Sequence, residues 1–596
     1  MNHIRSDVVT GVFLASALTL SVACGAASAA EGAGGLLQQL EKNETTHTFK
    51  EQKPPEVKQE EKKPVVEEHQ GGPKVFVKRF RLEGNTLISD AELLSDVVLD
   101  NGKEMTLDEI KGVADSITAK YRARGYLIVN AYVPSQTIFD GAVISKKKGG
   151  YAIENAFGAV LIKVVEGTLG AITVRDNHHY SASFIKRYLE TARTDPSLKQ
   201  ETLEKALLLL NEYPSLSVRT TLSAGKEPGT TDINATATDS RPLSGTVSYD
   251  NFGVKSTGKN RLSASLNAGN AITSGDMIKL NGIIGIDRID PLGLSYGRAE
   301  YIVPAGGFGT QIGAYYSNTV YRVGGNDSLA VLKLNGSATV AGIYATHPLL
   351  KTFEQSLKVR AGGEYISLYD HLLGSTQDND EIRKITATIS YELLDRFKGR
   401  NFINFGYARG LGGFLGGTKQ GTLNPGPSYS GAGNTFDKFT LDAIRVQKLP
   451  GYTYLMASGN FQYSPDRLFS AERMQLGGEG SVRGVNPATT SGDSGYFTSL
   501  ELVASPFYPE TELFKQKLGN MLKLALFTDY GGVSNTSPRP QEHSSSTLSS
   551  VGVGVRLYGG TLFSCKLDWA VPSTHGAYND FRVSESQVYV QAIVSF

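Results

Sequence analysis

The C-terminal stretch Val588-Tyr-Val-Gln-Ala-Ile-Val-Ser-Phe596 carries an apolar residue at every second position. Successive side chains of a β-strand point to opposite faces, so these apolar residues would share one face. Such a face is typical of a strand that contacts lipid in a transmembrane barrel. We therefore expect a last barrel strand here, with Phe596 as the C-terminal signal of the barrel. The expected lipid-facing residues are Val588, Val590, Ala592, Val594 and Phe596.

The region over residues 242–596 is rich in Gly and Tyr and repeats this alternation in short segments. Gly, Asn and Asp residues separate the segments, as turns require. At roughly 10 residues per strand plus turns, the region suits about 14–18 strands. We predict an all-β transmembrane barrel, with an array of soluble β-sandwiches as the alternative. The clearest segments are 261–268, 310–316 and 522–527.

Residues 1–29 have the pattern of a secretory signal peptide. His3 and Arg5 precede an apolar stretch over 8–23, and Ala27-Ser-Ala29 offers a cleavage site. An uncleaved anchor is the alternative, but the apolar core is short for a membrane helix. Cys24 lies in a weak lipoprotein motif, which leaves lipidation as a further alternative.

Composition and motifs argue against several other classes of protein. Cleavage after residue 29 would leave Cys565 as the only cysteine, so we expect no internal disulfide and no cysteine-based metal site. The formal net charge of +1 gives no general case for nucleic-acid binding. The sequence has no H-E-x-x-H or C-x-x-C motif, and the adjacent His178 and His179 have the pattern of surface residues. We expect neither an enzyme nor a bound metal or cofactor.

Residues 30–73 are rich in Glu, Lys, Gln and Pro, and include the run Gln52-Lys-Pro-Pro-Glu-Val-Lys-Gln-Glu-Glu-Lys-Lys-Pro64. This composition cannot bury enough apolar surface to order itself, so we predict a linker. Near its start, Leu36, Leu37 and Leu40 would form one apolar face of a helix over 34–42.

Residues 74–168 and 169–241 each show a strand, two helices and two strands, which predicts two small α+β domains in tandem. In the first domain, Ser89 is expected to cap a short helix, and Gly125 to end a longer amphipathic one. A Lys-rich looped insertion is expected over 145–155. The predicted elements are 75–82, 90–98, 107–124, 128–133 and 159–165, then 172–175, 183–191, 200–212, 218–222 and 232–238.

A family resemblance rests on motifs that occur in one order along the chain. Three segments resemble the first polypeptide-transport-associated (POTRA) domain of two-partner secretion (TpsB-type) transporters. They are Phe80-Arg-Leu-Glu-Gly-Asn-Thr86, Tyr121-Arg-Ala-Arg-Gly-Tyr126 and Ala131-Tyr-Val-Pro-Ser-Gln136. A fourth, Val164-Val-Glu-Gly167, looks like the end of that domain. These transporters are the haemolysin secretion/activation and filamentous-haemagglutinin transporter family. Gly477-Gly-Glu-Gly-Ser-Val-Arg-Gly484 is similar to the Val-Arg-Gly-Tyr signature of the wider POTRA-plus-barrel superfamily, with Val485 in place of the aromatic residue. Phe527-Thr-Asp529-Tyr-Gly531 resembles the partner motif on a barrel strand.

The resemblance implies a barrel of sixteen strands in the bacterial outer membrane, preceded by two POTRA domains in the periplasm. It also implies that the loop bearing Arg483 folds back into the lumen, where its guanidinium would pair with Asp529. The remaining residues of this anchor and its loop motif are Gly478, Gly480, Val482 and Gly484. Their spacing does not fit a phosphate-binding glycine loop.

The resemblance further implies export of one large partner exoprotein, adhesin- or cytolysin-like, which the POTRA domains capture in the periplasm. An extended client segment would add to an exposed sheet edge, and the candidate edge comprises Val218, Arg219, Thr220 and Thr221. The helix over 34–42 matches in position a plug helix of some relatives. Outer-membrane lipid and the barrel assembly machinery are the other expected partners. The alternative functions are an assembly factor for other barrel proteins and a diffusion porin.

Overall fold

The chain forms two compact units in the computed structural model. One unit combines Met1–Gln52 with Pro242–Ala305 and Thr310–Phe596, and the other comprises Lys53–Arg241 with Gly306–Gly309. The expected signal peptide and its cleavage site lie outside the described residues. The structure describes residues 32–44, 57–59, 74–99, 102–139, 142–147, 150–154, 158–195, 198–227, 229–287, 292–324, 328–422, 425–506, 512–513, 516–540, 542–573 and 586–596.

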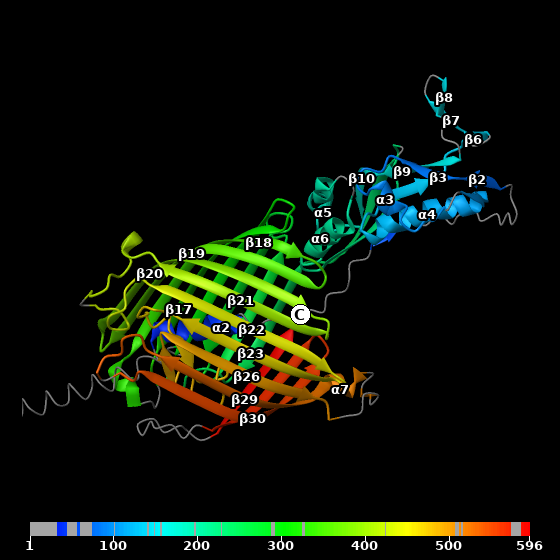
Figure 1. The fold of residues 1–596 in the computed structure, drawn as a ribbon. Coiled ribbons are helices and arrows are strands. Elements are labelled where there is room, and N and C mark those ends of the chain that lie inside the picture. The colour runs from blue at the N-terminus through cyan, green and yellow to red at the C-terminus, as the bar shows by residue number, and fades with distance from the viewer. Residues whose placement is uncertain are drawn as a thin grey trace, which may run out of the picture. The chain divides into compact units, whose positions relative to one another are not determined.

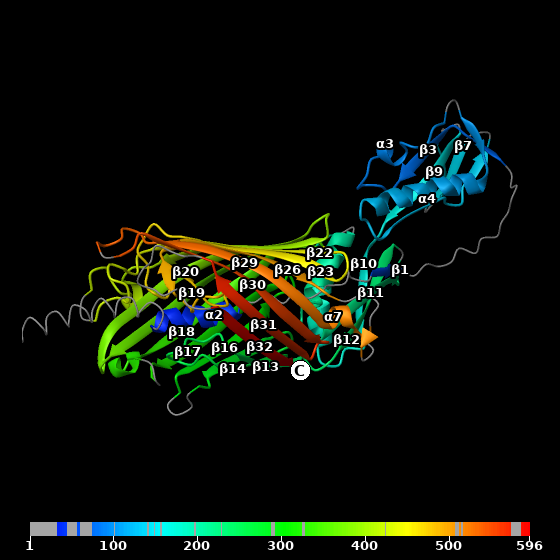
Figure 2. The ribbon, with the colours of Figure 1, turned by 90° about the horizontal axis from the view of Figure 1, so that it is seen from below.

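The larger unit is a closed barrel of sixteen strands, each antiparallel to both of its neighbours (Figures 1 and 2). The predicted all-β transmembrane barrel is therefore confirmed, and its strands follow one another around the wall in chain order. They are β13 (Leu243–Asp250), β14 (Arg261–Gly269), β15 (Met277–Gly285), β16 (Leu294–Ala305), β17 (Thr310–Arg322), β18 (Asn335–Lys351), β19 (Gln355–Leu372), β20 (Ser375–Leu394), β21 (Gly399–Gly410), β22 (Asp437–Leu449), β23 (Thr453–Tyr463), β26 (Ser494–Ala504), β29 (Leu522–Ser534), β30 (Ser545–Gly559), β31 (Phe563–Pro572) and β32 (Gln587–Ser595).

The barrel closes where β32 pairs with β13. The register runs from Thr246 opposite Ser595 to Asp250 opposite Gln591. Phe596 extends the seam, because its backbone N–H and C=O both bond with Gly245 at 3.0 Å. The C-terminal stretch thus forms the last strand of the barrel, as its alternation predicts.

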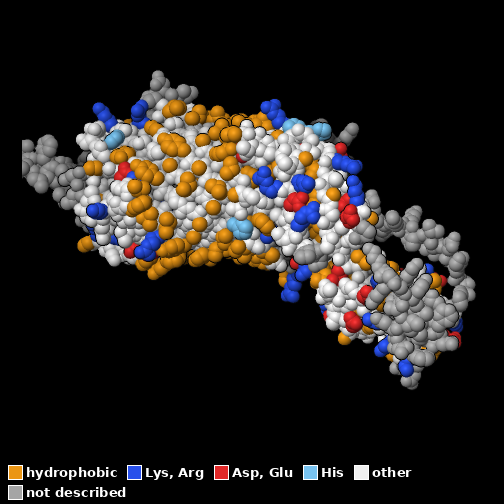
Figure 3. All heavy atoms as spheres, turned by 90° about the horizontal axis from the view of Figure 1, so that it is seen from above, with side chains coloured by type: hydrophobic (Ala, Val, Ile, Leu, Met, Phe, Trp, Pro, Cys, Tyr) orange, Lys and Arg blue, Asp and Glu red, His pale blue; other side chains and the backbone are white. Residues whose placement is uncertain are grey.

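Side chains alternate between the outer wall and the lumen along the barrel strands. On β26, Leu500 and Leu502 are exposed on the outside, while Glu501 between them is 6% exposed. On β31, Leu567 is likewise exposed and its neighbour Asp568 is buried. Figure 3 shows the hydrophobic side chains gathered over the outer wall. The acids that the sequence inserts between these apolar residues therefore point into the lumen.

Short elements lie in the connections of the barrel and in front of it. Helix α2 (Ala33–Glu44) precedes the barrel sequence and lies inside the barrel in both ribbon views (Figures 1 and 2). No helix within the described ranges has the length and apolar character needed to cross a bilayer. The elements in the connections are η2 (Ser328–Leu332), η3 (Phe414–Gly416), β24 (Met474–Leu476), β25 (Thr490–Gly492), β27 (Glu512–Leu513), β28 (Gln516–Lys517) and α7 (Leu518–Met521).

The first domain of the smaller unit packs two helices on a sheet of order β3-β9-β5. Its core includes Ile110, Ala114, Ile117 and Tyr121 from the long helix. Thr106 and Glu109 form a capping box at the start of this helix, which explains where it begins. The elements are β2 (Val75–Val77), β3 (Arg79–Glu83), α3 (Asp90–Leu93), β4 (Lys103–Met105), α4 (Leu107–Ala123), β5 (Val129–Tyr132) and β9 (Ala159–Glu166).

Several details of this domain differ from the predictions. Helix α3 ends at Leu93 instead of continuing to residue 98, and the Ser89 side chain makes no capping bond. Leu107, at the start of the predicted amphipathic helix, is exposed, because it is the first residue of α4 and the buried face of that helix begins at Ile110. The predicted loop over 145–155 is part of a three-stranded sheet of β6 (Thr137–Phe139), β7 (Ala142–Lys147) and β8 (Gly150–Glu154). Gly125 ends α4 in the left-handed region with a φ of 85°, as expected.

Glu166, at the end of β9, binds the loop that follows β3 through hydrogen bonds. Its carboxylate accepts bonds from the backbone N–H of Thr86 (2.7 Å) and of Leu87 (2.9 Å), and from the Tyr121 hydroxyl (2.7 Å). Burial acts to raise the pKa of Glu166, but the hydrogen bonds from Thr86, Leu87 and Tyr121 outweigh it, so this pKa lies below its ordinary value. The ionised carboxylate therefore stabilises the folded domain.

Replacing Glu166 by Gln should destabilise the first domain by about 1–2 kcal/mol, because two backbone donors and a phenol lose a charged acceptor. A lowered folded pKa means that the stabilisation exists above the unfolded pKa of about 4.3 and is lost as the pH falls through the folded pKa. Hydrogen exchange of residues 84–88 should show this pH response in the parent chain and not in E166Q. Glu83→Gln, at an exposed site of the same domain, is the control; equal protection in E166Q and the parent would contradict the role.

The second domain of the smaller unit has a sheet of order β1-β11-β12-β10 with two helices packed on it. Its core contains Phe184, Tyr188, Leu207 and Tyr213. The order of strand, helices and two strands agrees with the predicted α+β domain. The elements are β1 (Val57–Gln59), β10 (Thr168–Arg175), α5 (Ala182–Leu189), η1 (Glu190–Thr194), α6 (Gln200–Leu210), β11 (Leu216–Ala224) and β12 (Thr230–Asp239).

Candidate functional site: a lumen loop, a lumen helix and a sheet edge

The connection between β23 and β26, residues 464–493, is here called the lumen loop. It contains the hairpin β24–β25, whose pairing runs from Met474 opposite Gly492 to Leu476 opposite Thr490. Near the tip, Val482 and Val485 are buried, and they share an apolar cluster with Leu476 and with residues of the wall. A loop buried in this way folds inward, because a solvated loop would leave these side chains in water.

The structure brings Arg483, at the loop tip, onto Asp529 of β29. The contact is bidentate: Nε lies 2.8 Å from Oδ2 and Nη2 lies 2.8 Å from Oδ1 of the carboxylate. The backbone N–H of Arg483 also donates to Asp529 (3.1 Å). The guanidinium carbon lies 3.3 Å from the centre of the Phe527 ring. A rigid fork of donors on a carboxylate, with an aromatic face beside it, fixes both position and orientation.

Two further acids of the wall share the Arg483 guanidinium. Nη1 lies 3.0 Å from Oε2 of Glu501 on β26 and 3.4 Å from Oδ2 of Asp568 on β31. Arg556 of β30 bridges the same two carboxylates, and Lys566 of β31 contacts Asp568 at 3.3 Å. A buried acid of this kind is tolerated only when it is paired, so the tip depends on all of these strands.

The glycines of the motif set the shape of the loop tip. Gly478 and Gly484 have φ values of 89° and 88°, in the left-handed region that other residues rarely adopt. At Gly484 a Cβ would also lie 3.1 Å from the carbonyl oxygen of Ala570 on the wall. Gly480, by contrast, is exposed. The Val485 carbonyl accepts a bond from the Tyr589 hydroxyl (3.1 Å).

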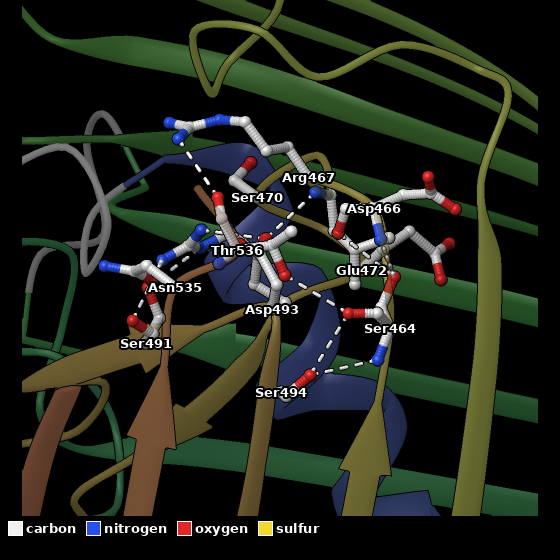
Figure 4. Close-up of polar contacts among 12 residues, drawn as sticks. Ser464, Asp466, Arg467, Ser470, Glu472, Ser491, Asp493, Ser494, Asn535 and Thr536 are labelled. Carbon is white, nitrogen blue, oxygen red and sulfur yellow. Dashed lines mark hydrogen bonds and ion pairs between the residues drawn. The ribbon is translucent and has the colours of Figure 1, made fainter. Parts of the chain in front are cut away.

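The root of the loop is held by a second set of polar contacts, drawn in Figure 4. Asp493, which is fully buried, accepts bonds from the backbone N–H of Leu468 (2.9 Å) and of Thr536 (2.8 Å). Its Oδ1 also lies 3.0 Å from Nη1 of Arg473. These contacts tie the first arm of the loop, residues 464–473, to its second arm, residues 490–493.

Helix α2 lies against the wall and against the first arm of the loop. Its apolar face packs into a cluster with Tyr321, Tyr344 and Phe469, which confirms that Leu36, Leu37 and Leu40 form one buried face. Two polar contacts fix the helix in addition. The Ala33 N–H donates to Asp370 of β19 (3.0 Å), and Gln38 Nε2 donates to the Ala471 carbonyl (2.5 Å).

The predicted client edge, Val218 to Thr221, lies on β11, and the structure shows a strand already paired there. β1, from the segment predicted as a linker, runs parallel to β11 with Val57 opposite Thr220 and Gln59 opposite Leu222. Of the predicted edge residues, Val218 and Thr220 are buried, while Arg219 is exposed. The edge of this domain therefore accepts an extended segment, and the segment belongs to the same chain.

An inward loop locked to the wall of a sixteen-stranded barrel, in a chain whose earlier residues form two small α+β domains, defines an outer-membrane protein of the POTRA-plus-barrel class. The model of the haemolysin secretion/activation protein ShlB/FhaC/HecB family matches residues 229–557, and the ShlB-type POTRA model matches residues 75–144. The chain belongs to this family of two-partner secretion transporters. It is an outer-membrane pore with periplasmic POTRA domains that exports a partner protein.

Named relatives agree with this assignment over most of the chain. The heme/hemopexin transporter protein HuxB of Haemophilus influenzae is 26% identical over 503 residues, covering 83% of this chain and 82% of its own. The outer membrane transporter CdiB of Escherichia coli is 22% identical over 520 residues, covering 84% and 81%. The family consists of transporters, which favours export over the alternative of an assembly factor.

Two solved structures share the fold. That of CdiB from Escherichia coli has a TM-score of 0.67 at 20% identity and covers 96% of this chain and 99% of its own. That of CdiB from Acinetobacter baumannii has a TM-score of 0.61 at 15% identity, covering 94% and 96%.

The sequence predictions missed Glu501, Asp568, Arg556 and Lys566 of the tip site, and Arg473 and Asp493 of the root. A signal for the first two exists in the sequence: each is a single acid between two residues that face lipid, as in Leu500-Glu-Leu502. Within the described ranges, no group of His, Cys, Asp and Glu side chains could hold a metal ion.

Proposed function

We propose that this pore exports one large, unfolded exoprotein and that the loop tip, helix α2 and the β11 edge are its working parts. The observation that carries the proposal is the occupied lumen: a loop anchored by Arg483 and a helix docked on that loop both lie where a client must pass. Folding of the client at the cell surface would supply the pull. Outer-membrane lipid would surround the wall, and the barrel assembly machinery would insert it.

The overall function is tested by secretion of any large exoprotein that a neighbouring gene encodes, in cells with and without this chain. We expect loss of that one protein from the medium and an unchanged profile of other outer-membrane barrels. Broad depletion of those barrels would instead identify an assembly factor and would exclude dedicated export.

Client capture is proposed to occur by addition of a strand to β11. The parallel pairing of β1 supports this, because it shows that the backbone groups of β11 at Thr220–Leu222 can bond with an extended segment. Since β1 occupies that place, a client that binds there must displace it.

Locking β1 onto β11 should therefore block capture. Lys58 and Thr221 are register partners, and neighbouring strands lie at a spacing that a disulfide can bridge. In a Cys565→Ser background, Lys58→Cys with Thr221→Cys should lower binding of the client's N-terminal region about tenfold when oxidised. Reduction should restore it.

Lys58→Cys alone, oxidised in the same way, is the matched control and should bind normally. If the cross-linked chain bound and secreted the client as well as the reduced one, the β11 edge could not be the capture site.

Helix α2 is proposed to plug the pore at rest. The supporting contacts are its buried apolar face and its bonds to Asp370 and Ala471. Asp370 lies near the end of β19 farthest from Gln355, and β19 runs parallel in direction to β13. Helix α2 therefore begins at the end of the barrel opposite to the one where β13 starts.

A further inference from the structure

Three successive residues of the lumen loop contact three different parts of the barrel unit. The Ala471 carbonyl accepts the bond from Gln38 of helix α2, and the Arg473 guanidinium contacts Asp493 of the second arm. Between them, the Glu472 carboxylate contacts the barrel wall. Glu472 thus links the place where the helix docks to the place where the loop is rooted.

Glu472 is bound by two lysines from different strands. Its Oε1 lies 2.6 Å from Nζ of Lys384 on β20, and its Oε2 contacts Nζ of Lys438 on β22. Lys384 also lies 2.9 Å from Glu364 of β19, so the pairs continue along the wall. The Glu472 side chain is 1% exposed, and a carboxylate buried to this degree needs its cations.

The position of helix α2 depends on the first arm just before Glu472. Leu468 and Phe469 are fully buried in the same cluster as the helix. Gly34 of the helix lies so close that a Cβ there would be 2.4 Å from Ser470 Oγ and 2.7 Å from the Ala471 nitrogen. A small displacement of this arm would therefore disrupt the packing of helix α2 against Ser470 and Ala471.

We propose that Glu472 is a positioning residue for helix α2, and that its ion pairs with Lys384 and Lys438 determine how firmly the helix occupies the lumen. This inference rests on the proposed plug role of α2. It concerns a different part of the wall from Arg483: β20 and β22 hold Glu472, whereas β26, β29 and β31 hold the tip. Loss of the Glu472 charge frees the helix and leaves the tip locked.

Planar-bilayer recordings test the proposal. Glu472→Gln keeps the size of the side chain and removes its charge, and it should raise the fraction of time that the channel is open roughly tenfold. Lys438→Gln, which removes one of the cations, should act in the same direction. Asp395→Asn, at the ion pair with Arg445 in the turn after β20, is the control and should leave the channel closed.

The decisive comparison uses a chain that lacks residues 32–44. In that background E472Q should have no further effect, because a residue that acts through the helix has nothing left to act on. A further rise would show that Glu472 acts on the pore itself and would overturn the proposal.

The remaining outcomes separate the two proposals. If the deletion opens the channel and neither E472Q nor K438Q does, the role of Glu472 is wrong and the plug stands. If the deletion leaves the conductance unchanged, both the plug role of helix α2 and the positioning role of Glu472 are wrong. Heat-dependent migration in gels verifies that each variant is a folded barrel.

Discussion

Replacing Arg483 by Ala should lower secretion of the client at least about tenfold, although the barrel still reaches the membrane. The change leaves Asp529, Glu501 and Asp568 without the cation that they share, with only Arg556 and Lys566 nearby. Breaking a buried ion pair of this kind costs about 3–5 kcal/mol. The loop tip should therefore leave its place on the wall. The measurement is the amount of client in the medium relative to folded transporter in the membrane.

An exposed ion pair provides the matched control. Arg409 contacts Asp437 at 3.3 Å, but its side chain is 54% exposed, so Arg409→Ala should have little effect on secretion. A charge exchange, Arg483→Asp with Asp529→Arg, should recover part of the secretion that Arg483→Asp abolishes. If the exchange restores no secretion, the direct pair between Arg483 and Asp529 does not explain the effect of R483D. Normal secretion by R483A would contradict the role of Arg483 as the anchor of the loop.

Deleting residues 32–44 should raise the ion conductance of the pore several-fold, because helix α2 fills part of the lumen and its apolar face covers the cluster around Tyr321 and Phe469. With the helix gone, water would enter the space that it occupied. The measurement is single-channel recording in planar bilayers, with cell sensitivity to large antibiotics as a second readout.

The control for this deletion alters the neighbouring segment and keeps the helix. Replacing Val57–Gln59 by Gly-Ser-Gly alters only β1 and should leave the conductance at its resting value. A chain without residues 32–44 that conducts like the parent would show that the helix does not plug the pore.

The architecture could be predicted from the sequence because it follows from local periodicity. Alternation in the last strand, the leucines of α2 and the left-handed cap at Gly125 are each decided by a few neighbouring residues. Helix α3 was predicted too long because residues after Leu93 continue as separate turns, with Val97 N–H bonding to the Leu94 carbonyl. The sequence patterns of a short helix and of a run of turns differ little, so the pattern over 90–98 does not distinguish them.

The functional contacts were less accessible to prediction. Resemblance to a family, and not residue spacing, pointed to Arg483 and Asp529. Glu501 and Asp568 join them because the strand order β26-β29-β30-β31 places their strands on either side of β29 and β30. Glu472 meets Lys384 and Lys438 through a loop that crosses the lumen. Contacts of this kind depend on the register of many strands, which no short segment specifies.

The seam between β13 and β32 has a consequence for how the barrel is made. The two strands lie at opposite ends of the barrel sequence, and their pairing includes the bonds between Gly245 and Phe596. Until β32 has been synthesised, the sheet has two free edges, and unpaired edges promote aggregation. The unfolded chain must therefore be protected from wrong pairing until β32 joins β13. Damage to Phe596 would be expected to lower the yield of barrels more than the activity of those that form.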